Sequence, residues 1–388
     1  MGEIILRVYA FSSVNGRNDY CNVSVTVESN DDNICADRQG QISGQILTQS
    51  GEPMADVEVL NAGLELEFQQ TDADGHFSFT GLQEGNDYTI QPYYNFDMLN
   101  GVTTLDILLI GRYLLEENDG LTAYQLIAAD ANRSGAVTIL DLIQIRRVIL
   151  GLDADFDNNT SWRFIPADYF FPNPLDPWEE TFPEVANFNN LLGNEFVEFT
   201  AIKVGDVDGN ARPTTFFGEP NDDNGRSRRE TVFLEMDRAN SQELLLYSGQ
   251  QIPTAGLQFT LELSPSATVI PGQIGEGSYR RIENQLLVSF VPRDGESIDP
   301  DRPLLSIMGA EVRRLPQLMT NRGALRAEAY GTDFTTYDLG LRLREDELFE
   351  AAETGLLEVF PNPFYERARL DFHWPATEAI SLRITGPE

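Results

Sequence analysis

Oxygen-bearing side chains recur at alternate positions in one stretch of the chain, DANRSGAVTILDLIQIRRVILG, which runs from Asp130 to Gly151. Gly135 occupies the sixth position, where a twelve-residue loop must turn sharply. The candidate ligands include the carbonyl at the seventh position and a ninth residue acting directly or through water: Asp130, Asn132, Ser134, Ala136, Thr138 and Asp141. A hard cation prefers six to eight oxygen ligands, and this spacing wraps them around one point. The stretch therefore predicts a calcium loop.

The residues after this loop predict a helix, and the whole loop–helix has a copy earlier in the chain. Residues 102–115 match residues 137–150 at seven of fourteen positions, with an offset of thirty-five residues. In both copies apolar residues return at helical spacing. One residue is missing just after Gly101, so Asp106 keeps the last ligand position while the start of the first loop is blurred. The alternative is that Asp106 and Asp141 only cap helices, where aspartate is favoured anyway.

Two groups of oxygen-bearing residues are candidates for the early ligands of this first loop. The nearer group consists of Asn95, Asp97 and Asn100. The more distant group, in the sequence GDVDGN, consists of Asp206, Asp208 and Asn210. We hypothesise that the chain returns at the distant group to complete the first site with Asp97 and Asp106. The alternatives are an exposed acidic turn at GDVDGN, and a first loop that binds calcium weakly or not at all.

A duplicated loop–helix of this length resembles a type I dockerin, a small calcium-dependent module that docks into cohesin domains. The resemblance covers residues 95–152, and aspartate rather than glutamate at the twelfth loop position fits it. It implies Ca2+ as the bound ion and a cohesin-like domain as the partner, either in the same chain or external.

The chain as a whole predicts a multidomain, mainly β protein, with β-sandwiches flanking a small all-α pair of calcium-binding helices. The expected segments are a truncated end of an immunoglobulin-like repeat at 1–34, a β-sandwich at 35–94, the dockerin-like module at 95–152, an aromatic-rich extension packing on it at 153–217, a polar linker at 218–230, a second β-sandwich at 231–347 and a truncated C-terminal domain at 356–388.

Both predicted sandwiches resemble known modules. In the first, the stretch TDADGHFSF is similar to the transthyretin-like sandwich of carboxypeptidase regulatory domains. Asp72 and Asp74 within it are read as a hairpin turn rather than another calcium loop, because strands flank them closely. His76 has no partner histidine or cysteine nearby, which argues against zinc. The second sandwich has about eight strand-like runs, and AGLQFTLEL and NQLLVSFVP resemble strands of cohesin-like domains.

The C-terminal stretch LLEVFPNPFYERARLDFHW resembles the sorting domain of type IX secretion substrates, with the match on the PNPF turn. That resemblance implies export through type IX secretion machinery to the outside or surface of a bacterial cell. The two cysteines, Cys21 and Cys35, fit a local disulfide in an exported protein, or two unrelated thiols. The N-terminus carries no signal peptide, so we expect a fragment of a longer protein.

Composition and motifs exclude several functions. The formal net charge of −35 argues against nucleic acid, and no apolar run is long enough for a membrane span. No catalytic motif surrounds the two histidines or the two cysteines, so we expect no enzyme. The chain is then the non-catalytic part of a secreted or cell-surface protein, adhesive or scaffolding. The alternative is the accessory half of a polysaccharide-degrading enzyme whose catalytic domain lies upstream.

Apolar residues exceed what one small helical pair buries. The extension is rich in aromatic residues, namely Trp162, Phe164, Tyr169, Phe170, Phe171, Trp178 and Phe182. We expect these to pack over the helices, the alternative being an exposed platform for sugar rings. The helices also have apolar residues outside one stripe, among them Leu105, Leu108 and Leu140. This surplus predicts a docking face for a β-sandwich, with residues 231–347 as the in-chain candidate.

Overall fold

The structure, a computed structural model, describes residues 2–11, 18–27, 38–116, 120–213, 229–240, 242–292, 297–309, 316–319, 325–344, 355–360 and 369–373. The fold is mainly β with a small helical region, so the predicted fold class is confirmed. Cys35, most of the predicted linker 218–230 and the PNPF turn at 361–364 lie outside the described residues. Near the two ends, β1 (Gly2–Phe11) pairs with β2 (Asn18–Val27), and β21 (Gly355–Phe360) pairs with β22 (Arg369–His373), both antiparallel.

The chain forms two compact units. The first contains residues 1–93, 164–169 and 183–201, and the second contains residues 94–163, 170–182 and 202–388. Residues of the predicted extension 153–217 therefore contribute to both units.

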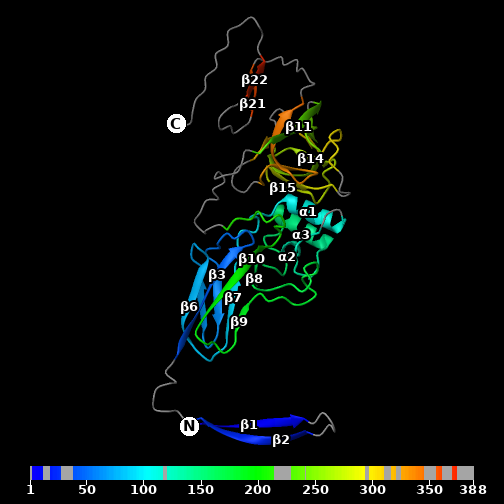
Figure 1. Cartoon of the computed structure of the whole chain (residues 1–388). Helices are drawn as coiled ribbons and strands as arrows, with labels where there is room; N and C mark the ends of the chain where they lie inside the picture. The colour runs from blue at the N-terminus through cyan, green and yellow to red at the C-terminus, as the bar shows by residue number, and fades with distance from the viewer. Residues whose placement is uncertain are drawn as a thin grey trace, which may run out of the picture. The chain divides into compact units, whose positions relative to one another are not determined.

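Two four-stranded sheets, visible in Figure 1 around the labels β3 and β7, form most of the described part of the first unit. Their strands are β3 (Gln39–Thr48), β4 (Glu58–Ala62), β5 (Leu66–Gln70), β6 (His76–Gln83), β7 (Tyr88–Tyr93), β8 (Trp162–Pro166), β9 (Ala186–Phe188) and β10 (Asn194–Lys203). One sheet has the order β6-β3-β10-β8 and the other β5-β4-β7-β9. Burial alternates along β3, where Ile42 and Ile46 are fully buried, as expected for a strand with one face on a core.

Strands from the extension complete these sheets. β10 pairs in parallel with β3, and β9 pairs antiparallel with β7. A strand that joins its neighbour from about 150 residues away leaves no local pattern that reveals the pairing.

Three helices occur among the described residues: α1 (Thr104–Leu114), α2 (Ala123–Ala129) and α3 (Ile139–Ile149). The repeat predicts α1 and α3, whereas α2 was not predicted from the sequence. Each helix begins with a threonine capping box, at Thr103, Thr122 and Thr138. α1 and α3 pack on each other, and their shared core is apolar, with Ile107, Ile110, Ile145, Val148 and Ile149 at its centre.

A ten-stranded sheet, drawn from yellow-green to orange in Figure 1, folds around a second apolar core in the second unit. Its strands are β11 (Thr231–Asn240), β12 (Glu243–Ser248), β13 (Thr254–Glu262), β14 (Thr268–Pro271), β15 (Tyr279–Ile282), β16 (Gln285–Phe290), β17 (Leu305–Met308), β18 (Gln317–Leu318), β19 (Glu328–Gly331) and β20 (Thr336–Leu343). Its order is β14-β17-β12-β11-β20-β19-β13-β16-β15, with β18 paired to β13.

Candidate metal sites and docking face

The second loop of the repeat connects α2 to α3 and draws its oxygen-bearing residues together. Asp130 ends α2, Asp141 lies in the first turn of α3, and both are fully buried. The amides of Ser134 and Gly135 donate to the two carboxylate oxygens of Asp130, at 2.8 and 2.9 Å. The Asn132 amide donates to Asp141 at 3.2 Å. The loop backbone therefore wraps around two buried carboxylates.

The other predicted ligands are held by hydrogen bonds within the same loop. The Asn132 side-chain oxygen accepts from the Ser134 amide, and the Ser134 hydroxyl donates to the Ala136 carbonyl at 3.1 Å. The Thr138 hydroxyl donates to Asp141 at 3.0 Å. Burial raises the pKa of Asp130, while the amides of Ser134 and Gly135 partly oppose this shift. Burial of a carboxylate in this way is costly unless a positive charge is close.

A second cluster forms where two distant segments meet. Ligand oxygens of Asp106, Asp206 and Asp208 lie within 4.8 Å of one another. Asp106 is in the first turn of α1 and is fully buried, Asp206 is buried, and Asp208 is exposed. The Val207 amide donates to Asp106 at 2.6 Å. The structure thus brings the GDVDGN segment to Asp106, as hypothesised, but Asp97 does not belong to this cluster.

The two clusters share several hydrogen bonds at corresponding positions. In the second loop, Asp130 accepts from the amides four and five residues later; Asp206 does the same with Asn210 and Ala211, at 3.2 and 2.8 Å. The Asp208 amide donates to Asp106 at 3.3 Å, just as that of Asn132 donates to Asp141. Residues 206–211 therefore correspond to the first half of a loop whose second half is residues 101–106.

The break in this split loop falls between Ala211 and Gly101. A Cβ atom on Gly101 would lie 2.7 Å from Ala211, and Gly101 has a φ of +75°. The Asn100 side chain bridges the break, because its amide nitrogen donates to the Arg212 carbonyl and its oxygen accepts from the Arg212 amide. Asn95 accepts from the Ser161 amide at 2.7 Å. Asn95 and Asn100, two of the three nearer candidates, thus act in backbone contacts here.

Negative charge exceeds positive charge in the split loop. Burial, followed by the charges of Asp206 and Asp208, raises the pKa of Asp106 well above its usual value. Burial and the neighbouring Asp208 raise the pKa of Asp206 to about 7. Lys203 lies close by, donating to the Met98 carbonyl at 2.9 Å, but burial lowers its own pKa to about 8. An all-oxygen donor set with surplus negative charge fits a hard divalent cation such as Ca2+.

The first turn of α1 packs on the β-sandwich of the same unit. Leu105 and Leu108 are buried in a cluster with Ala255 and Tyr330. The Thr104 amide donates to the Gln258 side chain at 2.8 Å, and the Thr104 hydroxyl lies 2.7 Å from that of Ser289. A first-turn amide has no partner within its own helix, so Gln258 satisfies a group that the helix leaves open.

On the sandwich side of this face, the buried side chain of Glu328 accepts several hydrogen bonds. Glu328 accepts from Arg229 at 2.6 Å, from Gln258 at 3.3 Å and from the Tyr330 hydroxyl at 2.9 Å. Arg326 also lies 3.2 Å from its carboxylate. Glu328 therefore orients two side chains that face α1, Gln258 and Tyr330.

The residues of α3 that correspond to the docked residues of α1 are exposed. Residues 139, 140 and 143 correspond to 104, 105 and 108 through the offset of thirty-five. Ile139 is 66% exposed and Leu140 is 60% exposed, whereas Leu105 is 7% exposed. At its far end α3 does meet the sandwich, because Arg280 donates to the carbonyls of Leu150 and Gly151. A cation at a helix C-terminus is favourable.

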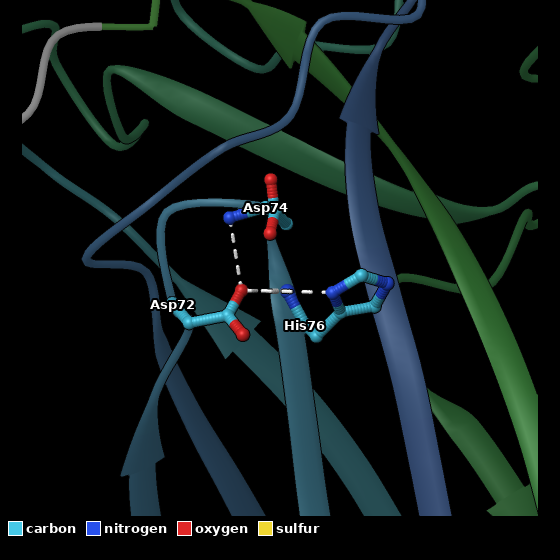
Figure 2. Close-up of side chains that lie close together, drawn as sticks. All are labelled: Asp72, Asp74 and His76. Carbon is cyan, nitrogen blue, oxygen red and sulfur yellow. Dashed lines mark hydrogen bonds and ion pairs between the residues drawn. The ribbon is translucent and has the colours of Figure 1, made fainter.

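The acidic turn at the start of β6 is a separate feature, shown in Figure 2. One oxygen of Asp72 accepts from the amides of Asp74 and His76, at 3.0 and 2.8 Å, and lies 3.7 Å from the His76 ring. All three side chains are exposed. The hydrogen bonds are those of a tight hairpin turn, which agrees with the turn interpretation.

The aromatic extension is mostly packed. Trp162, Phe164, Phe171 and Phe182 are buried, Tyr169 and Trp178 are half-buried, and Phe170 is exposed. Trp178 packs against the helical core. This burial favours packing over a platform for sugar rings.

Several residues of these sites were not predicted from the sequence. Thr103 was recoverable, because it lies thirty-five residues before Thr138. Gln258, Ser289, Glu328 and Tyr330 carry no local pattern, since their meaning depends on the helix that they contact. No helix among the described residues is long and apolar enough to cross a membrane.

Residues 100–150 match the family model of the dockerin type I domain. No curated protein matches the chain. A non-cellulosomal cohesin from the archaeon Archaeoglobus fulgidus is similar at 15% identity and a TM-score of 0.19, covering 31% of this chain and 88% of that one. The major pilin subunit BcpA of Bacillus cereus has 9% identity and a TM-score of 0.20, with 77% and 66% covered. A type II cohesin dyad from the adaptor ScaA scaffoldin of Acetivibrio cellulolyticus has 9% identity and a TM-score of 0.21, with 79% and 87% covered.

Proposed function

We propose that this chain is a calcium-stabilised docking protein, in which a dockerin-type module is held by a cohesin-like β-sandwich of the same chain. The match of residues 100–150 to the dockerin type I domain supports a non-catalytic docking role for that segment. The observation that carries the in-chain partner is the set of contacts made by Thr104. Its amide and hydroxyl, both buried, find their partners in Gln258 and Ser289.

We further propose that two calcium ions stabilise the module. In the second loop, the ligands are Asp130, Asn132, Ser134, Ala136, Thr138 and Asp141. In the split loop, they are Asp106, Asp206 and Asp208, with Asn210 and Thr103 at the positions equivalent to Ser134 and Thr138. Calcium would add positive charge beside these buried carboxylates, and binding would then stabilise the fold.

Calorimetric titration of the whole chain with calcium tests both sites. We expect two ions for the parent, one for Asp106→Asn and one for Asp141→Asn. Asp74→Asn is the matched control, because it removes an acid from the hairpin turn of Figure 2 and should leave two ions bound. A parent that binds one ion, lost in Asp141→Asn and kept in Asp106→Asn, would exclude the split loop.

Hydrogen exchange tests the in-chain docking. The buried amide of Thr104 donates to the Gln258 side chain, so its exchange reports on the interface. We expect Gln258→Ala to speed exchange in the peptide around residues 103–108. Gln285→Ala, at the opposite end of β16 from Ser289, should leave that exchange unchanged. Equal exchange in both variants would mean that α1 is not docked.

The module is proposed to act outside the cell, in an adhesive or scaffolding protein without catalytic activity. Support comes from the antiparallel pairing of β21 and β22, which brackets the PNPF sequence. If the segment is a type IX sorting signal, deleting residues 356–388 from the full-length protein abolishes surface display. Unchanged display contradicts the assignment. A catalytic domain upstream in the full reading frame would instead favour the accessory half of a polysaccharide-degrading enzyme.

A further inference from the structure

We propose that the chain associates with a second copy of itself through the open edge of β5 (Leu66–Gln70), in an antiparallel two-fold pair centred on Phe68. The contact lies within the first unit of each copy and uses neither calcium loop.

β5 has a pairing strand on one side only. It ends its sheet, in the order β5-β4-β7-β9, and in the described part of the chain no strand pairs with its other side. Just beyond the strand, the Thr71 amide donates to the Val57 carbonyl across the ladder. Because such positions alternate along an antiparallel pair, residues 67 and 69 also direct their backbone groups to β4. The backbone groups that face the open side are those of Leu66, Phe68 and Gln70.

The side chains of β5 do not protect this edge. All of its residues are exposed, with Leu66 at 67% and Phe68 at 60%. Edge strands of monomeric proteins commonly carry a lysine, a proline or a bulge that prevents pairing with another chain. β5 has none of these, and its register with β4 is continuous. An apolar edge strand that is open in this way can accept a further strand.

The strand that fits this edge best is β5 itself, in one register. When Phe68 lies opposite Phe68 of the second copy, Glu67 lies opposite Gln69. The Gln69 side-chain oxygen accepts from the Ser78 amide at 3.1 Å, so its amide nitrogen is the group that donates to Glu67. A register centred on Glu67 would instead set two carboxylates directly opposite each other, which is unfavourable. Charge therefore selects the register centred on Phe68.

The same register joins apolar side chains on the outward face of the sheet. Val59 and Asn61 of β4 are buried, so Leu60 between them points away from the core. Phe68 lies directly opposite Leu60 in the ladder. In the pair, Leu60 and Phe68 of one copy continue into Phe68 and Leu60 of the other, in one row across four strands. Side chains directly opposite each other on a sheet are in contact, so this row buries apolar surface that is exposed in the single chain.

Long-range charge opposes the association. The formal net charge is −35, so two copies repel each other. Salt screens this repulsion, with a Debye length of about 8 Å at physiological ionic strength, and leaves backbone hydrogen bonds and apolar contacts in place. Added sodium chloride should therefore strengthen the pair. Association that weakens with salt would indicate a contact driven by opposite charges and would overturn the proposal.

Cysteine crosslinking tests the pair and its register in the whole chain. Phe68→Cys and Leu66→Cys are compared in a background that carries Cys21→Ser and Cys35→Ser. In the proposed pair, the two Cα atoms at position 68 are about 5.5 Å apart, which a disulfide can bridge. Those at position 66 are about 14 Å apart, which it cannot. We expect disulfide-linked dimers to form roughly tenfold faster with Phe68→Cys, since only that position meets the bridging distance. Equal rates, or a faster rate with Leu66→Cys, would overturn the pair.

Sedimentation velocity over a range of protein concentrations measures the association itself. We expect the parent to shift from monomer to dimer as concentration rises. Phe68→Glu should lower the association constant on the order of tenfold, because it removes an aromatic pair and sets like charges opposite each other. Phe196→Glu is the matched control, since Phe196 is also 60% exposed but lies on β10 in the other sheet, and it should associate as the parent does. A parent that stays monomeric at every concentration and salt level, or an equal loss in both variants, would overturn the proposal.

Discussion

Truncation of Leu105 measures the strength of the docking face, because the chain has a matched position that is not docked. Leu105 lies between α1 and the sandwich and is 7% exposed, whereas Leu140 occupies the equivalent place in α3 and is 60% exposed. Both follow a capping threonine by two residues, so helix propensity and cap effects cancel in the comparison. The difference between the two alanine variants therefore isolates the contact with the sandwich.

Leu105→Ala should cost about 2–3 kcal/mol, since a buried leucine loses its transfer free energy and leaves a cavity against Tyr330. Leu140→Ala should stay within about 0.5 kcal/mol, as exposed positions do. Thermal unfolding of the calcium-loaded chain would then show a midpoint lower by about 4–12 °C for the first variant. Equal shifts would refute the reasoning, because α1 and α3 would then be equally free of the sandwich.

Two further predictions concern the split loop. In calcium-free buffer the free energy of unfolding should fall as pH rises from about 4 to about 7, by at most about 4 kcal/mol, because folded Asp206, with a pKa of about 7, keeps a proton that the unfolded chain releases. Urea denaturation at pH 5 and pH 7.5 measures this fall, and a fall that persists in excess calcium would contradict a metal role for Asp206. Gly101→Val should abolish binding of one calcium ion in calorimetry, because its side chain meets Ala211, while Gly111→Ala, where a Cβ atom meets nothing, should retain both. Two ions bound by Gly101→Val would contradict the split geometry.

The sequence predicted those parts of the molecule whose pattern is local. The repeat located α1 and α3 and placed Asp130 and Asp141 in one loop, because loop spacing and helical periodicity act over a few residues. The missing residue after Gly101 indicated that the first loop is incomplete. The alternating oxygen-bearing residues that begin at Asp206 suggested which segment completes it.

The pairing of strands that are distant in the sequence was not predicted. β8, β9 and β10 follow the helices in the sequence but join sheets of the first unit, and α2 is a seven-residue helix without a full apolar stripe. Thr104 aligns with Ile139 through the repeat and carries no local pattern of its own, yet the sandwich binds its hydroxyl and its amide. Such polar contacts acquire meaning only when two surfaces meet, so no single-segment pattern reveals them.

The break at Gly101 also has a mechanical consequence. A pulling force along the backbone enters the split loop through residues 101–106 and leaves through residues 206–211. With calcium bound, tension crosses directly between these segments and bypasses α2 and α3. Without calcium, the stretch between the two segments, about one hundred residues and roughly 330–360 Å when fully extended, is held only by its own packing and by the pairing of β9 and β10 with β7 and β3. The ion would act as a mechanical link between the two segments, and calcium binding would set how far this part of the chain stretches before α2 and α3 are strained.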